Sequence, residues 1–211
     1  MTAIPAQDLR TNIGTWAVSN CQSPAVAKLL NARYPTERFD PTFVGQHLTT
    51  TYFDTRGFAL RKARNRSSQY LTLRIRCYEP SYVYALSAKT ESQKFRVQIS
   101  TEDAEAANDG QYSAIWEKVL PGDLLARLYS ITSRTDLLPV VATKCRRYAV
   151  EDSQDRFTLD MSITTDTGKK LETNVLEYKS TVPTAPIPKD LASLNLRPMK
   201  LSKFLWATQW R

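Results

Sequence analysis

The sequence predicts an α+β fold whose main element is an antiparallel β-sheet, and three observations support this class. From about residue 47, segments that alternate apolar and polar residues follow one another, separated by short turn-forming or charged breaks. Elsewhere, apolar residues recur at the spacing of an amphipathic helix. No shift in composition divides the 211 residues, so we expect a single domain over 1–211.

Helical spacing predicts three helical regions. The first covers 22–34, where Ser23 precedes Pro24 as an N-cap and first-turn pair. The second begins at Thr101, with acids in its first turn, and continues through YSAIWEKVL and GDLLARLYSITSR. The third is expected at 198–208, after a stretch too rich in proline for regular structure.

Seven segments are predicted as strands because they are rich in β-branched and aromatic residues and alternate in polarity. Side chains on a strand point to alternate faces, so each segment has one apolar and one polar face. The predicted strands cover 47–55, 69–79, 81–89, 92–100, 137–150, 155–163 and 170–180.

Cysteine and histidine usage argues against several kinds of site. Cys21, Cys77 and Cys145 are too widely spaced for a disulfide framework or a cysteine-based zinc site. The single histidine, His47, has no second histidine or nearby cysteine, and it is interpreted as a strand residue. No apolar run approaches the ~20 residues of a membrane span, and the first residues do not resemble a secretory signal. We therefore expect a cytoplasmic protein.

The charge balance points to an anionic partner. The formal charge is +8 and the isoelectric point is near 9.4. The basic residues recur at every second position on predicted strands, whereas acids are crowded into 101–109 and into loops. Four strands carry a charged pair of this kind, three of them wholly basic: Arg74 with Arg76, Lys94 with Arg96, Lys144 with Arg146, and Glu177 with Lys179.

These pairs predict a pocket for phosphates. A single basic pair is compatible with a solvated sheet face, but such a face normally mixes both signs, because like charges opposite one another are destabilising. Gathered cations repel unless a polyanion lies among them, and Arg and Lys suit phosphate oxygens. For basic residues from several strands to contact one ligand, the sheet would have to curve and close as a barrel does. We expect a basic tunnel that holds a short chain of phosphates.

Isolated acids on the same strands suggest a metal. Glu177 and Asp160 are candidates to hold Mg²⁺ or Mn²⁺, which take oxygen ligands and bridge phosphates. The alternatives are a structural role for Asp160 and an ion pair inside the pocket for Glu177.

In order and spacing, the motifs TTYFDT, LTLRIRCYE, KFRV, KCRRY, RFTLD, VLEYK and LSKFLWA resemble the VTC domain. That domain is the polyphosphate-polymerising relative of the CYTH, or triphosphate tunnel metalloenzyme, superfamily, and the resemblance covers about residues 47–207. It implies an eight-stranded antiparallel barrel tunnel, with helices packed outside and a triphosphate or polyphosphate end inside.

The resemblance also implies roles for individual residues. The family's metal-binding glutamate falls on Glu177. Its basic tunnel residues, including the lysine of a C-terminal SK motif, imply that the phosphates are bound by Arg74, Arg76, Lys89, Lys94, Arg96, Lys144, Arg146, Lys179, Lys200 and Lys203.

Two departures from the family pattern concern acidic residues. The first strand of family members alternates Glu and Lys, whereas LRTNIGTWAV contains neither. In ALSAK the expected glutamate is Ser87. Both changes remove acidic residues that could coordinate a metal, and this loss affects catalysis more than phosphate binding.

Three functions follow from the sequence. The first is metal-dependent phosphoryl transfer or hydrolysis on inorganic polyphosphate, tripolyphosphate or a nucleoside triphosphate. The second is a non-catalytic sensor of polyphosphate or an inositol pyrophosphate, and the third, which lacks a recognisable motif, is nucleic-acid binding with Tyr70, Tyr78 and Tyr148 as stacking platforms. In the catalytic case the acting residues would be Arg74, Arg76, Lys144, Arg146 and Glu177.

Overall fold

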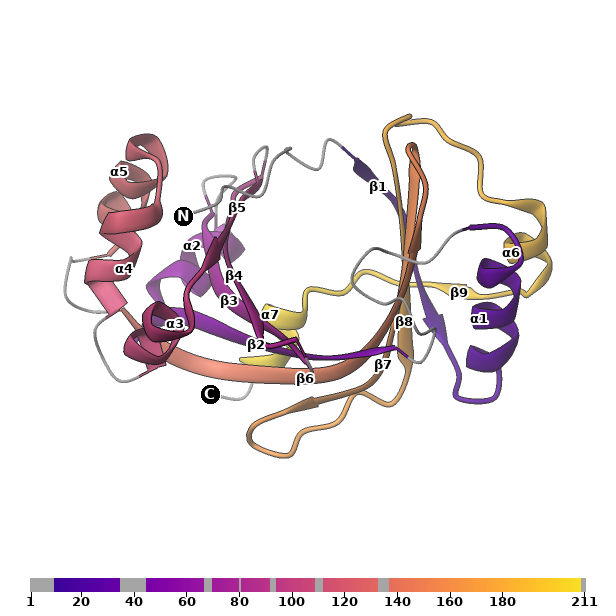
Figure 1. The fold of residues 1–211 in the computed structure, drawn as a ribbon, viewed down its shortest axis with the longest axis horizontal. Helices are drawn as coiled ribbons and strands as arrows, with labels where there is room; N and C mark the ends of the chain where they lie inside the picture. Colours follow the sequence, from indigo (N-terminus) through magenta and orange to yellow (C-terminus); the bar gives the residue numbers. More distant parts are fainter. Residues whose placement is uncertain are drawn as a thin grey trace. The chain divides into compact units, whose positions relative to one another are not determined.

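The computed structural model describes residues 10–34, 45–66, 70–79, 81–91, 94–108, 112–132 and 137–209 (Figure 1). The strands are β1 (Thr11–Val18), β2 (Gln46–Thr55), β3 (Thr72–Glu79), β4 (Val83–Lys89), β5 (Lys94–Ile99), β6 (Leu137–Glu151), β7 (Asp155–Thr165), β8 (Asn174–Ser180) and β9 (Arg197–Pro198). The helices are α1 (Ser23–Asn31), α2 (Ala59–Arg66), α3 (Thr101–Asn108), α4 (Tyr112–Val119), α5 (Gly122–Ile131), α6 (Lys189–Ser193) and α7 (Lys203–Ala207). None of the helices in this described part is long and apolar enough to span a membrane.

All nine strands belong to one sheet, in the order β5-β4-β3-β2-β6-β7-β8-β1-β9. The neighbours β3–β4, β4–β5, β7–β8, β1–β8 and β1–β9 are antiparallel, so the predicted α+β class with a mainly antiparallel sheet is confirmed. The sheet has one strand more than the eight expected from the resemblance. Its edge strands are β5 and β9, which are not paired with each other in the described residues. Closure into a barrel therefore stays a prediction.

The C-terminal helix is shorter than the predicted 198–208. Arg197 and Pro198 are extended and pair with Ala17 and Trp16 of β1, and the Met199 N–H donates to the Thr15 carbonyl at 2.9 Å. These backbone groups are thus used by a strand, and α7 begins only at Lys203. Backbone pairing with a strand far away in the sequence overrode the helical spacing of the apolar residues.

The described residues form two compact units, each assembled from separate segments of the chain. Unit 1 contains Thr49–Thr143 and the residues from Phe204 onward; unit 2 contains residues 10–48 and Lys144–Lys203. The expected single domain over 1–211 stays a prediction, and each unit is described separately below.

In unit 1, helices cover the apolar face of β3, β4 and β5. Leu73 and Ile75 of β3 and Leu86 of β4 are buried in a core that includes Trp116 of α4 and Leu128 of α5. Figure 1 shows α3, α4 and α5 beside these strands. The strand alternation predicted for LTLRIRC is therefore confirmed, and its basic residues lie on the face opposite this core.

In unit 2, α1 and α6 contribute to a second core with β1, β6, β7 and β8. Val26 of α1 and Leu191 of α6 are buried with Leu176 and Tyr178 of β8. The ring of Tyr178 stacks on Phe157 at 4.3 Å between centroids. Figure 1 shows α1 and α6 near β8. This unit also has one sheet face that packs on helices and one polar face.

Helix α2 was not predicted from the sequence, and a buried aspartate fixes its start. One Asp54 carboxylate oxygen accepts the N–H groups of Thr55 at 2.7 Å and Leu60 at 2.8 Å, and the other accepts that of Arg61 at 2.9 Å. Burial raises the pKa of Asp54, and the three N–H donors oppose this rise. The carboxylate satisfies donors that the first turn of a helix leaves without partners.

Removal of this carboxylate is expected to destabilise unit 1. An Asp54→Ala substitution leaves three N–H groups without their acceptor, and each unsatisfied buried donor costs about 1–3 kcal/mol. We expect a loss of about 3 kcal/mol in the free energy of unfolding, measured by urea denaturation. Glu105→Ala, an exposed change on α3, serves as the control and is expected to have little effect. A loss at Asp54 no larger than at Glu105 would contradict this assignment.

Candidate functional site

The polar face of unit 1 carries cations in register on three neighbouring strands. Arg74 of β3 pairs with Ser87 of β4, and Ser87 pairs in turn with Arg96 of β5. We call these three residues the arginine row. Directly opposed side chains on one sheet face lie about 4.5–5.5 Å apart at Cβ, so the two arginines flank the serine. The next row along the strands contains Lys89 and Lys94, opposite Thr72.

The cations of this face are withdrawn from water. Arg76 and Ser87 are buried, with 8% and 0% of their surface exposed, and Arg74 and Arg96 are half-buried. Among the described residues, the Nε atoms of Arg74 and Arg76 and the hydroxyl of Ser87 have no hydrogen-bond partner. Buried polar groups are normally paired, so this face has an unused capacity for hydrogen bonds.

The electrostatics of the arginine row favour an anion. Burial and the neighbouring positive charges of Arg76 and Arg96 lower the pKa of Arg74 to about 9, while Tyr52 and Tyr78 partly oppose the shift. Both main causes act by destabilising the charged guanidinium. A phosphate on this face would supply a negative charge that the described residues of β3, β4 and β5 do not place there.

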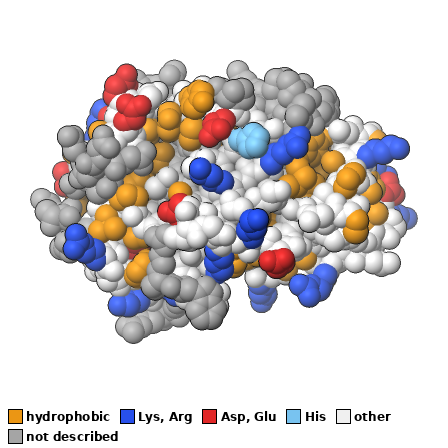
Figure 2. Space-filling model, turned by 90° about the horizontal axis from the view of Figure 1, so that it is seen from below, with side chains coloured by type: hydrophobic (Ala, Val, Ile, Leu, Met, Phe, Trp, Pro, Cys, Tyr) orange, Lys and Arg blue, Asp and Glu red, His pale blue; other side chains and the backbone are white. Residues whose placement is uncertain are grey.

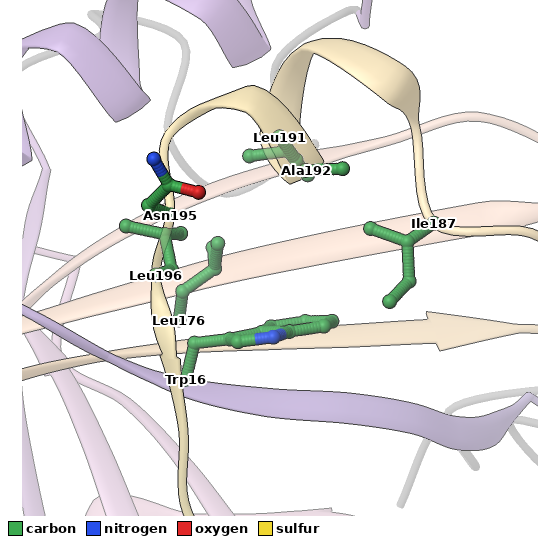
Figure 3. Close-up of a pocket in the computed structure, with 7 residues that line it drawn as sticks. All are labelled: Trp16, Leu176, Ile187, Leu191, Ala192, Asn195 and Leu196. Atoms are coloured by element: carbon green, nitrogen blue, oxygen red, sulfur yellow. The ribbon is translucent and has the colours of Figure 1, made fainter.

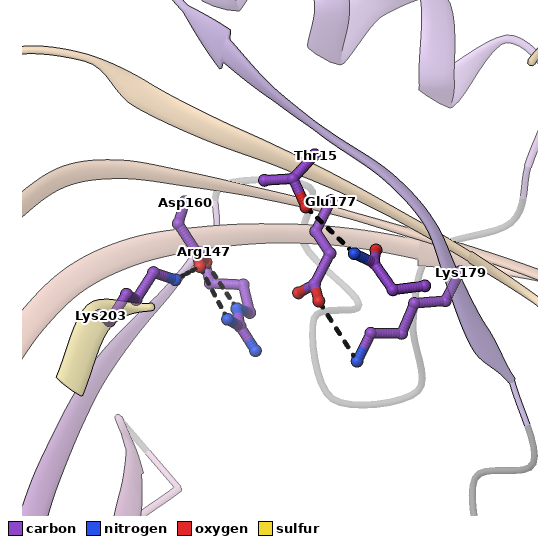
Figure 4. Close-up of polar contacts among 7 residues, drawn as sticks. Thr15, Arg147, Asp160, Glu177, Lys179 and Lys203 are labelled. Atoms are coloured by element: carbon purple, nitrogen blue, oxygen red, sulfur yellow. Dashed lines mark hydrogen bonds and ion pairs between the residues drawn. The ribbon is translucent and has the colours of Figure 1, made fainter. Parts of the chain in front are cut away.

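The polar face of unit 2 is organised around Asp160. Arg147 of β6 donates to both carboxylate oxygens, from Nε at 2.6 Å and from Nη2 at 2.8 Å. Lys203, at the start of α7, also donates to Asp160. Figure 4 shows the two cationic side chains pointing at this carboxylate. The side chains of Asp160 and Arg147 are only 2% and 7% exposed, so the group forms a buried ion-pair network.

Glu177 and Lys179 lie farther along this face. They belong to β8, where Glu177 pairs in register with Thr158 of β7 and Thr15 of β1. The Lys179 ammonium lies 3.4 Å from a Glu177 carboxylate oxygen, as drawn in Figure 4. The interpretation of Glu177 as part of an ion pair is confirmed by this contact.

Two predicted pocket residues, Lys144 and Arg146, do not lie on the polar face of unit 2. Lys144 and Arg146 are both exposed, and they share the face of β6 on which Tyr148 is buried in the apolar core. Because side chains alternate along the strand, Arg147 takes the polar face instead. The assignment of Lys144 and Arg146 to the pocket stays a prediction, and Arg147 is a further candidate on the polar face. Tyr148 and Val150 are the apolar residues that follow Arg146 on its own face of β6. Their alternation in the sequence indicates that Arg147 lies on the opposite, polar face.

A second arginine, Arg156 on the neighbouring strand β7, was not among the predicted site residues. Arg156 is buried and shares the polar face of β7 with Thr158 and Asp160, opposite the face of Phe157. Its Nε lies 3.4 Å from Glu151. The alternation in DRFTLD carries this signal, because Arg, Thr and Asp alternate with Phe and Leu.

The remaining predicted cations differ in exposure. Lys89 and Lys200 are exposed, whereas Lys94 and Lys203 are half-buried. Figure 2 shows one face of the molecule, on which Lys and Arg side chains are spread among uncharged surface with Asp and Glu between some of them. Exposure alone therefore does not mark the site, and the distinguishing feature is that Arg76 and Arg147 are buried and Arg74 is half-buried.

The described residues contain no carboxylate cluster that is free for a divalent metal. Mg²⁺ and Mn²⁺ take oxygen ligands, and Mg²⁺ is commonly held by one or two carboxylates together with substrate phosphates and water. In the chain as described, no group of three or more His, Cys, Asp or Glu side chains is placed to hold an ion. Of the two predicted ligands, Asp160 is paired with Arg147 and Lys203, and Glu177 lies against Lys179. The structural alternative for Asp160 is the one that these contacts support.

An apolar pocket of about 180 Å³ also occurs in unit 2 (Figure 3). None of the predicted site residues lines it, and Asn195 is the one lining residue that has a side-chain amide. The lining residues are Trp16, Leu176, Ile187, Leu191, Ala192, Asn195 and Leu196. This chemistry does not suit phosphates, so the basic faces remain the candidate site.

Comparisons with known proteins agree with this fold. The model of the family described as "VTC domain" matches residues 16–209. A comparison with curated proteins gave no match.

Solved structures give extensive matches at low identity. A "putative adenylate cyclase" from Bacillus halodurans is 16% identical, with a TM-score of 0.67 over 93% of this chain and 96% of that one. A "putative adenylyl cyclase" from Hippeastrum, described as having a dominant triphosphatase activity, is 15% identical, with a TM-score of 0.64 over 95% of each chain. The PH1819 protein of Pyrococcus horikoshii is 13% identical, with a TM-score of 0.55 over 93% and 94%. At these identities the similarity shows a common fold.

Asp160 is expected to be essential for the stability of unit 2. An Asp160→Asn substitution leaves Arg147 buried without a compensating charge, and breaking a buried pair in this way costs about 3–5 kcal/mol. Urea denaturation measures the loss, and Glu172→Gln, an exposed change, is the matched control with an effect within about 0.5 kcal/mol. A loss below about 1 kcal/mol at Asp160 would show that Arg147 does not depend on this carboxylate.

Proposed function

We propose, from the premise that this chain belongs to the VTC domain family, that its basic sheet faces bind a short chain of phosphates. The ligand class is inorganic polyphosphate, tripolyphosphate or a nucleoside triphosphate. The observation that carries the proposal is the arginine row, Arg74–Ser87–Arg96, with Arg76 buried beside it and no carboxylate opposite.

The physical argument rests on the cost of burying like charges. Cations withdrawn from water are unfavourable unless an opposite charge and hydrogen-bond acceptors are supplied. Phosphate oxygens supply both, and a guanidinium binds two of them at once. The Nε atoms of Arg74 and Arg76, which lack acceptors in the described structure, are suited to this ligand.

Unit 2 supports the proposal in a different way. Its polar face combines Arg147 and Lys203 with Arg156 and Lys179, and in the contacts described above their charge is opposed by Asp160, Glu177 and Glu151. The exposed Lys144 and Arg146 are not part of this face. We therefore add Arg147 and Arg156 to the proposed phosphate-binding residues.

Phosphate binding is compatible with two alternative functions, one catalytic and one non-catalytic. Metal-dependent transfer or hydrolysis needs in-line geometry and one or two metal ions on the phosphates. The triphosphatase activity described for the Hippeastrum protein makes this chemistry compatible with the fold. The pairing of Asp160 and Glu177 with cations instead favours the second form, a sensor of polyphosphate or an inositol pyrophosphate.

Nucleic-acid binding has little support among the proposed stacking residues. Tyr148 is buried in the apolar core of unit 2, and Tyr70 lies against the guanidinium of Arg64 at 4.6 Å. Stacking on bases needs exposed aromatic faces. Phosphate binding without base recognition remains the better interpretation.

Replacing the central arginine is expected to weaken binding without unfolding the protein. Arg74→Ala removes hydrogen bonds to a charged ligand, each worth about 1.5–3 kcal/mol, so the Kd for tripolyphosphate should rise about 10- to 100-fold in isothermal titration calorimetry. The urea midpoint of the free protein should not fall, because the change also removes repulsion from Arg76 and Arg96.

Lys62→Ala, an exposed change on α2, provides the control for a general loss of positive charge. Its Kd for tripolyphosphate should change by less than about threefold at physiological salt, because exposed charges are screened. Equal losses at Lys62 and Arg74 would mean that binding is a diffuse surface effect. Unfolding of Arg74→Ala would mean that Arg74 is a structural residue.

A further inference from the structure

We infer that this chain binds its phosphate chain as the metal-free anion, through cations alone, and that Ser87 sets this property. The inference deepens the proposed function and depends on it. It concerns which form of the ligand is bound, because in solution polyphosphates exist both free and as complexes with divalent cations. A site that needs a metal binds the complex better, whereas a purely cationic site binds the free anion better.

The first support is the composition of the polar face of unit 1. Within the described residues of β3, β4 and β5, this face contains five cations and no aspartate or glutamate. A divalent ion brought here by its phosphates would find no carboxylate ligand and would add positive charge to a positive surface. The cations of this face are Arg74, Arg76, Lys89, Lys94 and Arg96.

The second support is the state of the acids in unit 2. Arg147 engages both oxygens of the Asp160 carboxylate, and Lys203 adds a second cation to one of them. The carboxylate of Glu177 lies 3.4 Å from the Lys179 ammonium. Recruiting Asp160 as a metal ligand would require breaking a buried ion pair and leaving Arg147 uncompensated, and Glu177 would have to be shared with Lys179.

The third support is the position of Ser87. It is fully buried between Arg74 and Arg96, and its hydroxyl finds no partner among the described residues. A carboxylate at this position would either neutralise the two arginines or provide a metal ligand beside them. Serine does neither, so it neutralises neither guanidinium, and the Nε of Arg74 has no acceptor among the described residues. The hydroxyl adds one uncharged donor to the same row.

The first experiment compares wild-type protein in EDTA with the same protein in excess Mg²⁺, with tripolyphosphate as the probe in isothermal titration calorimetry. We expect binding in EDTA, and a Kd at least threefold higher in Mg²⁺, because the metal competes for the free anion. Binding that requires Mg²⁺, or is tighter with it, would overturn the inference. If tripolyphosphate binds under neither condition, the proposed function itself fails, so the two failures are distinguishable.

The second experiment places a carboxylate in the arginine row. Ser87→Glu is expected to raise the Kd in EDTA at least tenfold, and Mn²⁺ should restore part of the lost affinity. Ser87→Gln is the matched control, since it has the same size without the charge, and Mn²⁺ should raise its Kd, as Mg²⁺ does for the wild type, instead of restoring affinity. Identical behaviour of the two variants would overturn the role of Ser87. Should neither variant fold, the wild-type comparison decides the metal question and Ser87→Ala tests the residue, with an expected Kd that is higher in Mg²⁺ than in EDTA, as for the wild type.

The third measurement is phosphate release from tripolyphosphate in Mg²⁺ or Mn²⁺. Binding without turnover is expected. Sustained release that depends on metal, and that Arg74→Ala abolishes, would overturn the inference while supporting the catalytic form of the proposed function.

Discussion

Burial of cations on the polar side of a sheet is the constraint on which the candidate site depends. Helices cover one face of the strands in each unit, and the basic residues occupy the face left over. A charge withdrawn from water must be compensated by an opposite charge or by a ligand. The two units meet this requirement differently, and the difference points to what the protein binds.

In unit 2 the charge of the buried cations is compensated within the protein, because Asp160 lies between Arg147 and Lys203. This network fixes the direction of both cations without leaving a carboxylate for another purpose. Unit 1 has no equivalent acid in its arginine row, and the positive neighbours of Arg74 lower its pKa. The free capacity for an anion is therefore greatest at Arg74 and Arg76, whose Nε atoms have no acceptor in the described part of the chain.

The proposed metal-free binding would exchange one kind of phosphate recognition for another, with Ser87 at a position where the family resemblance implies a glutamate. Metal-assisted recognition divides the negative charge of the ligand between an ion and the protein. Recognition by Arg and Lys alone places all of it on the protein, which favours tight binding of the free anion. Ser87, buried at the centre of the arginine row, is the residue at which this exchange is most directly visible.

The sequence by itself determined the α+β class, most of the strands and the polar faces of β3 and β5, because period-two alternation is a local property that survives folding. It also placed Arg74 and Arg76 opposite the apolar core. Only the tertiary structure decided that Asp160 is held by Arg147 and Lys203. It also decided that β9 forms where a helix was expected. Each of these outcomes depends on partners far away in the sequence, whose positions no local pattern specifies.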